Sequence, residues 1–102
     1  MIAAGEATLG PVPWIERRLL RINDEIERLR HEEHLVEGEL NMHRHLADDA
    51  LRDAAVYEGL DRAESRMANK DVAALERALA KTRRAIAALE ERRARLLTRL
   101  GG

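Results

Sequence analysis

The chain has no cysteine, no phenylalanine and no glutamine, and it has a single Trp, a single Tyr and a single Ser. Without cysteine it cannot form a disulfide, use a thiol nucleophile or bind zinc through thiolates. With so few aromatic residues, a hydrophobic core must be built from Leu, Ile, Val and Ala. The scarcity of Ser and Gln argues against low-complexity disorder beyond the chain ends.

An excess of charge of one sign and a long apolar run are also missing. The 102 residues carry 18 basic and 19 acidic side chains, so the formal net charge is −1. A nucleic-acid-binding protein normally carries a clear basic excess. No stretch approaches the roughly 18 apolar residues of a membrane span, and residues 1–10 lack the segments of a secretory signal. We therefore expect a cytoplasmic protein that contacts neither nucleic acid directly nor a membrane.

What is abundant is the composition of long helices: Ala, Glu, Lys, Leu and Arg account for 63 of the 102 residues. Two runs of residues advance by alternating steps of four and three, which is the spacing of a coiled-coil seam. The first run is Ile15, Leu19, Ile22, Ile26, Leu29, Glu33, Val36, Leu40 and His43. The second is Val72, Leu75, Leu79, Thr82, Ile86, Leu89, Arg93, Leu96 and Leu100.

The two runs mirror each other. When the first run is read forward and the second is read backward, the two residue numbers of every pair sum to 115. A constant sum describes two helices that run in opposite directions. We predict an all-α protein: an antiparallel coiled-coil hairpin with helices at about 14–57 and 61–100. Residues 1–12 would form a flexible arm and residues 13–102 a single domain.

Local signals support these helix ends. Pro13 suits the first turn of a helix, where its missing N–H costs nothing. Gly59 can end a helix in the left-handed conformation, and Asp61 with Glu64 fits an N-cap that starts the next one.

Two features of the fold stay open. Residues 48–67 could instead form a separate short helix, giving a three-helix bundle; the constant sum favours the hairpin. Apolar residues off the seam need a further neighbour, which dimerisation of two hairpins into a four-helix bundle would supply. They include Leu20, Leu35, Met42 and Leu46 in the first helix and Ala74, Ala78, Ala85, Ala88 and Leu97 in the second.

Some seam positions are polar. Glu33 lies opposite Thr82, Arg93 opposite Ile22, and His43 opposite Val72. Polar groups at such positions usually set the register and the number of partners, and we expect that structural role here. The alternative is that Glu33 or His43 marks a ligand site or a proton-sensitive site.

All four histidines lie between His31 and His45. His31 and His34 are three residues apart and could share a metal ion on a helix, although the pattern matches neither zinc proteases nor di-iron bundles. We regard the two as weak metal candidates and expect solvated histidines, with no bound metal and no cofactor. A ligand- or metal-responsive bundle using the His31–His45 region is an alternative function.

The sequence offers little for catalysis, because its only serine, Ser65, has no histidine nearby and no glycine-rich phosphate loop is present. We expect no enzymatic activity. The predicted turn carries more information, because acidic residues gather there. We single out as a partner-binding tip Asp53, Tyr57, Glu58, Asp61 and Arg62.

The segment Glu58-Gly59-Leu60-Asp61-Arg62-Ala63 resembles the coiled-coil fingertip of the DksA and Gre transcription factors, which reads Asp-x-x-Asp-x-Ala in DksA. Those factors present acids in the secondary channel of RNA polymerase. The resemblance covers six residues; the DksA zinc finger and the globular domain of Gre factors have no counterpart. A second resemblance is to small secreted helical hairpins of the WxG type, with Tyr57-Glu58-Gly59 at the aromatic-x-Gly turn.

Together these observations favour a non-enzymatic coiled-coil interaction module, most concretely a bacterial regulator that contacts the transcription machinery. We expect a homodimer whose protein partner is RNA polymerase or a sigma factor. A purely structural spacer is a further alternative.

Overall fold

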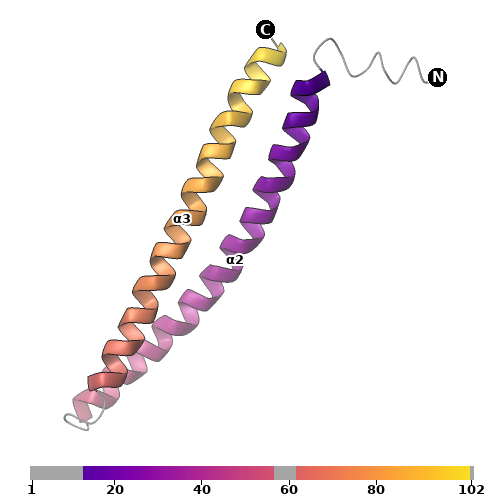
Figure 1. Ribbon diagram of the computed structural model, residues 1–102. Coiled ribbons are helices and arrows are strands. Elements are labelled where there is room, and N and C mark those ends of the chain that lie inside the picture. Colours follow the sequence, from indigo (N-terminus) through magenta and orange to yellow (C-terminus); the bar gives the residue numbers. More distant parts are fainter. Residues whose placement is uncertain (1–12, 57–61, 102) are drawn as a thin grey trace. The chain divides into compact units, whose positions relative to one another are not determined.

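The computed structural model describes residues 13–56 and 62–101, which form two helices and contain no strand (Figure 1). Helix α2 comprises Pro13–Val56 and helix α3 comprises Arg62–Gly101. The first helix begins at Pro13, where a proline loses no hydrogen bond. The predicted pair of long helices is confirmed. A separate helix at 48–67 is wrong, because residues 48–56 continue α2 without a break.

Gly38 does not interrupt α2, although it is a poor helix former. The seam on both sides of it is buried, and that burial outweighs the local preference. In the described part of the chain, neither helix is long and apolar enough to cross a membrane.

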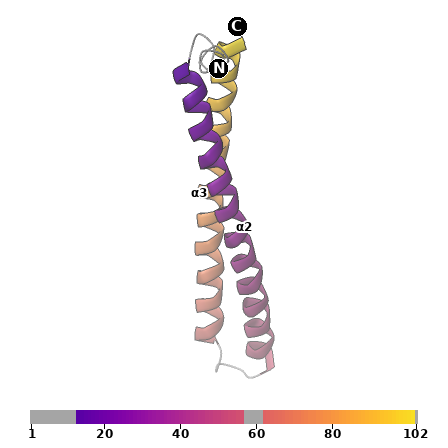
Figure 2. The same cartoon turned by 90° about the vertical axis from the view of Figure 1, so that its right-hand side faces the viewer.

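The chain divides into two packed units. The first, called the terminal unit here, comprises Met1–Arg30 and Ala85–Gly102; the second, the loop unit, comprises His31–Arg84. In each unit a segment of α2 lies beside a segment of α3, and the two run in opposite directions (Figures 1 and 2).

In the terminal unit, the core is a cluster of aliphatic side chains from both helices. Leu19, Ala85 and Leu89 are partly buried and pack against it. All of these residues except Ala85 belong to the predicted seam. The members of the cluster are Ile15, Ile22, Ile26, Leu29, Ile86 and Leu96.

In the loop unit, the seam continues with smaller side chains. Leu40 and Leu79 are buried, as are Ala47 and Ala50, which extend the same spacing toward the end of α2. Short side chains bury less apolar area per residue than Leu or Ile. The apolar contribution to stability is therefore smaller here than in the terminal unit.

Burial follows the predicted spacing closely. Every residue of the two runs is buried or half-buried except Leu100, which is 37 % exposed near the end of α3. Cross-helix contacts agree with the mirror, because Asn23 contacts Arg93 in the terminal unit and Arg44 contacts Glu76 in the loop unit. In both pairs the two residue numbers sum to within five of 115.

Candidate functional site: two edges of a helix pair

Three polar side chains of the seam, those of Thr82, Arg93 and Glu33, have partners within the protein. Thr82 is buried, and its Oγ1 donates a hydrogen bond of 3.1 Å to the carbonyl oxygen of Ala78. Arg93 is half-buried and donates from Nη1 to Asn23 Oδ1 at 3.0 Å. Among the described residues, no buried side-chain nitrogen or oxygen lacks a hydrogen-bond partner. Thr82 and Arg93 are therefore accommodated structurally, and they offer no unsatisfied group to a ligand.

Glu33 is half-buried and accepts a hydrogen bond of 2.8 Å from Arg83 Nε. The same guanidinium donates from Nη2 to Glu37 Oε2 at 2.7 Å. The hydrogen bond to Glu33, followed by the charges of Glu37 and Glu33, raises the pKa of Arg83 above its ordinary value. Arg83 thus holds two carboxylates that lie one helical turn apart on α2.

In each unit, cross-helix ion pairs of this kind lie on one side of the helix pair, which we call the paired edge of that unit. Its members directly follow seam positions on both helices. The signs alternate along each helix, so that every cation meets an anion. The pairs are Arg30–Glu90 at 2.6 Å in the terminal unit, and Glu37–Arg83 at 2.7 Å and Arg44–Glu76 at 3.0 Å in the loop unit.

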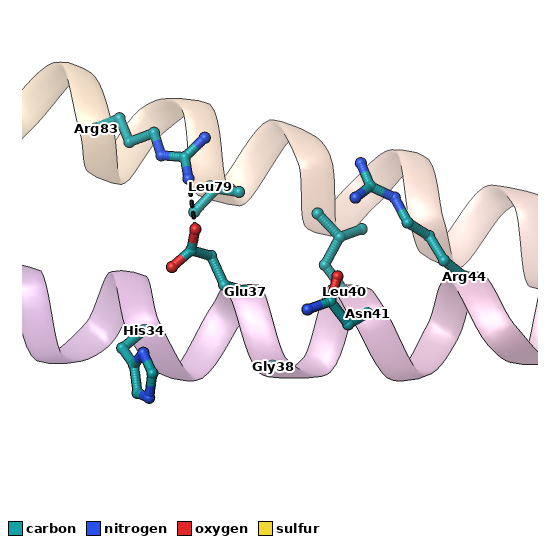
Figure 3. Close-up of a pocket in the computed structure, with 8 residues that line it drawn as sticks. All are labelled: His34, Glu37, Gly38, Leu40, Asn41, Arg44, Leu79 and Arg83. Carbon is teal, nitrogen blue, oxygen red and sulfur yellow. Dashed lines mark hydrogen bonds and ion pairs between the residues drawn. The ribbon is translucent and has the colours of Figure 1, made fainter.

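A groove of about 370 Å³ lies along the paired edge of the loop unit, with Leu40 and Leu79 at its floor (Figure 3). Figure 3 shows Arg83 reaching from α3 toward Glu37, whereas His34 points away from α3. Both arginines that line this groove already bind carboxylates, because Arg83 contacts Glu37 and Arg44 contacts Glu76. An anionic ligand would therefore have to break existing pairs.

The histidines are not assembled into a site. His31, His34 and His45 are exposed, and His43 is half-buried. In residues 13–56 and 62–101, no group of three or more His, Asp or Glu side chains is placed to hold a metal ion. The structure thus adds no support to a metal-responsive role for the His31–His45 region.

The predicted tip lies mostly outside the described residues. Tyr57, Glu58 and Asp61 are not among them, and Arg62 begins α3 without a described side chain. Asp53 is exposed, near the end of α2.

Asp53 also lines a second groove in the loop unit, of about 380 Å³. Leu46, Ala50, Met67 and Ala68 supply its apolar surface. His43 also lines the groove, together with four acidic residues: Asp49, Asp53, Glu64 and Asp71.

This groove lies on the side of the helix pair that is opposite the paired edge. We call this opposite side the open edge. The residues of the open edge directly precede seam positions, so they share one face of the helix pair. Large apolar side chains are exposed there: Leu35 (55 %), Met42 (56 %), Leu46 (53 %) and Met67 (66 %). The acidic residues on the open edge of the loop unit are Glu32, Glu39, Asp49, Asp53, Glu64 and Asp71.

Charge pairing is sparse on this open edge. Asp49 contacts Arg52 on its own helix at 3.4 Å. Within the described part of the chain, Asp53, Glu64 and Asp71 have no ion-pair partner. Of these groove acids, the sequence pattern predicted only Asp53 as a partner-binding residue, and it predicted Glu64 as a helix-capping residue. Steps of four and three back from Val72 extend the seam to Ala68 and Ser65. The residues directly before seam positions then include Glu64 and Asp71, so this count would have found both.

The chain matches no protein family model, and no curated protein or solved structure resembles it closely enough to be counted as a match. Function must therefore be argued from the two edges themselves.

Proposed function

We propose that this protein is a non-enzymatic interaction module, a coiled-coil hairpin whose binding surface is the open edge of the loop unit. The observation that carries this proposal is the row of more than half-exposed side chains Leu35, Met42, Leu46 and Met67. An apolar surface rimmed by charge is typical of a protein-binding site. The open edge has both features, whereas the paired edge has its charges satisfied within the protein.

Burying these side chains against a partner is favourable, at about 25 cal/mol for each Å² of apolar surface removed from water. The partner must also supply cations, since Asp53, Glu64 and Asp71 would otherwise be desolvated without a counter-charge. An assembly into a four-helix bundle would meet the first requirement, because a second helix pair can cover the open edge.

A more specific proposal is that the loop end contacts the transcription machinery. It is supported by the resemblance of Glu58-x-x-Asp61-x-Ala63 to DksA and Gre fingertips. The exposed acids Asp49, Asp53 and Glu64 add negative charge on the helices that lead to this segment. In this proposal RNA polymerase or a sigma factor is the partner, and the protein is a bacterial cytoplasmic regulator.

The two proposals can be tested side by side by measuring binding to purified RNA polymerase and to sigma factor. We expect the double variant Glu58→Ala/Asp61→Ala to keep its helical circular dichroism and lose binding. Met67→Glu tests the open edge, with Leu20→Glu as its control, because Leu20 is 65 % exposed and directly follows the seam residue Leu19, away from the open edge.

Loss of polymerase binding in the tip variant alone would place the contact at the loop. Unchanged binding in the tip variant would refute the transcription proposal. If Met67→Glu also matched Leu20→Glu, both in polymerase binding and in oligomeric state, the open edge would not be an interaction surface.

A further inference from the structure

The open edge of the terminal unit has the opposite charge to that of the loop unit. Six arginines of the terminal unit directly precede seam residues. Glu25 is the one acidic residue at such a position in this unit. In the loop unit the same positions carry six acids, with Lys81 as the one basic exception. The arginines are Arg18, Arg21, Arg28, Arg92, Arg95 and Arg99, and all six are exposed.

Local contacts occupy only some of these arginines. Arg28 contacts Glu25, Arg95 lies 3.6 Å from Glu91 on the same helix, and Arg99 lies over the Trp14 ring at 5.3 Å from its centre. Among the described residues, Arg18, Arg21 and Arg92 have no ion-pair partner.

The register makes this distribution costly for a single chain. On the paired edge, opposite charges meet, as in Arg30 and Glu90. On the open edge the same register places Arg18 across from Arg92, and Glu39 across from Asp71. Like charges at neighbouring positions are destabilising. The open edge of each unit therefore carries like charges that face each other. Another molecule can supply the opposite charge.

We propose that the occupant of the open edge of the loop unit is the open edge of the terminal unit of a second copy. Acids of one copy then meet arginines of the other, and the exposed Leu46 and Met67 are covered in the same contact. A two-fold symmetric pair forms this contact twice, since each copy contributes one acidic and one basic edge. The two copies therefore lie antiparallel to each other.

Small residues allow the approach of the second copy. Ala74 and Ala78 lie on the open edge of the loop unit, and Ala88 lies on that of the terminal unit; all three are exposed. Short side chains at these positions let helices pack closely without long side chains intervening. A side-by-side arrangement in the parallel sense would instead bring arginine to arginine and acid to acid.

This inference rests on the proposed role of the open edge as an interaction surface, and reciprocal charge reversal tests it. The first variant, Arg18→Glu/Arg92→Glu, makes the basic edge acidic. The second variant, Glu39→Arg/Asp71→Arg, makes the acidic edge basic. The matched control, Arg17→Glu/Arg84→Glu, changes the net charge as the first variant does but lies on the outer surface, where both arginines are exposed.

We expect the wild-type chain to sediment as a dimer at tens of micromolar. Each charge-reversal variant should weaken the dimer by at least about tenfold while keeping its helical circular dichroism. An equimolar mixture of the two should form a heterodimer, and the chain with all four reversals should form a homodimer again. The control variant should dimerise like the wild type, and added salt should weaken the wild-type dimer.

A wild-type monomer at these concentrations would overturn the second copy as occupant, and the Met67→Glu binding test would still decide whether the edge binds another protein. A dimer unaffected by both reversals, or a four-reversal chain that stays monomeric, would refute the antiparallel contact. Because the parallel arrangement predicts no rescue by the four-reversal chain, that variant separates the two arrangements.

Discussion

Arg83 on α3 donates its Nε hydrogen to Glu33 on α2 at 2.8 Å, which joins a seam position of one helix to the edge of the other. The same guanidinium binds Glu37 one turn further along. Two charged contacts from one planar group restrict both sliding and rotation of one helix against the other. In the loop unit, where the seam has smaller side chains, this arginine therefore contributes to register.

Replacing Arg83 by Met should lower the melting temperature of the protein, because Glu33 and Glu37 lose their shared cation. Arg84→Met is the matched control: Arg84 is also exposed, and no ion pair involves it among the described residues. Thermal unfolding followed by circular dichroism measures both. Equal melting temperatures for the two variants would show that the contacts of Arg83 are not stabilising.

Leu29 and Leu20 lie on the same helix segment but differ in burial, at 8 % and 65 % exposed. Leu29→Ala should cost about 2–5 kcal/mol of unfolding free energy, since it removes a core side chain and leaves a cavity. Leu20→Ala should change it by less than about 0.5 kcal/mol. Urea unfolding compares the two, and a similar cost at both sites would contradict the placement of the seam.

Gly38 lies in the middle of α2, and a Cβ added there would meet no atom within 4 Å. Gly38→Ala should therefore stabilise the protein by about 0.5–1 kcal/mol, through the lower backbone entropy of alanine in the unfolded chain. The midpoint of urea unfolding should rise without a change in slope. A loss of stability would mean that Gly38 serves a purpose that the free space around it does not reveal.

The hydrogen bond from Arg28 lowers the pKa of Glu25 below its ordinary value of 4.5. A depressed carboxyl pKa contributes stability above the unfolded-state value, and that contribution is lost as the pH falls through the folded-state pKa. Arg28→Ala should return the pKa of Glu25 toward 4.5, so the group takes up its proton at higher pH. Carboxyl chemical shifts followed by NMR titration measure this change, and an unchanged titration would exclude Arg28 as its cause.

Much of the fold could be predicted from spacing alone. Steps of four and three place residues such as Ile22 and Ile86 on one stripe of a helix, and apolar stripes must be buried. The constant sum then specified the antiparallel direction. The region after Ala47 could not be settled in this way, because its seam residues are small and a short separate helix would bury them as well.

The candidate site was less predictable. Arg44 could have paired with Asp48 one turn along its own helix, yet it contacts Glu76 on α3. Long side chains reach partners within a helix and across helices equally well, so the sequence pattern does not choose between them. The acidic turn was predicted as a binding site, whereas Glu64 was predicted only as a helix-capping residue and Asp71 was not singled out, because a single acid in a charge-rich helix carries no local signal of a groove.

By itself, then, the sequence determined two long helices, their opposite directions and the residues between them, because burial of apolar side chains dominates those choices. The tertiary structure decided between the long first helix that the constant sum favoured and a separate helix at 48–67, since α2 runs unbroken to Val56. It also decided which edge satisfies its own charges. The choice of edge depends on how the two helices of a unit are rotated against each other. The ion pairs of Arg30, Arg44 and Arg83 form on the paired edge of their units. Leu46, Met67 and their acidic neighbours stay exposed on the open edge.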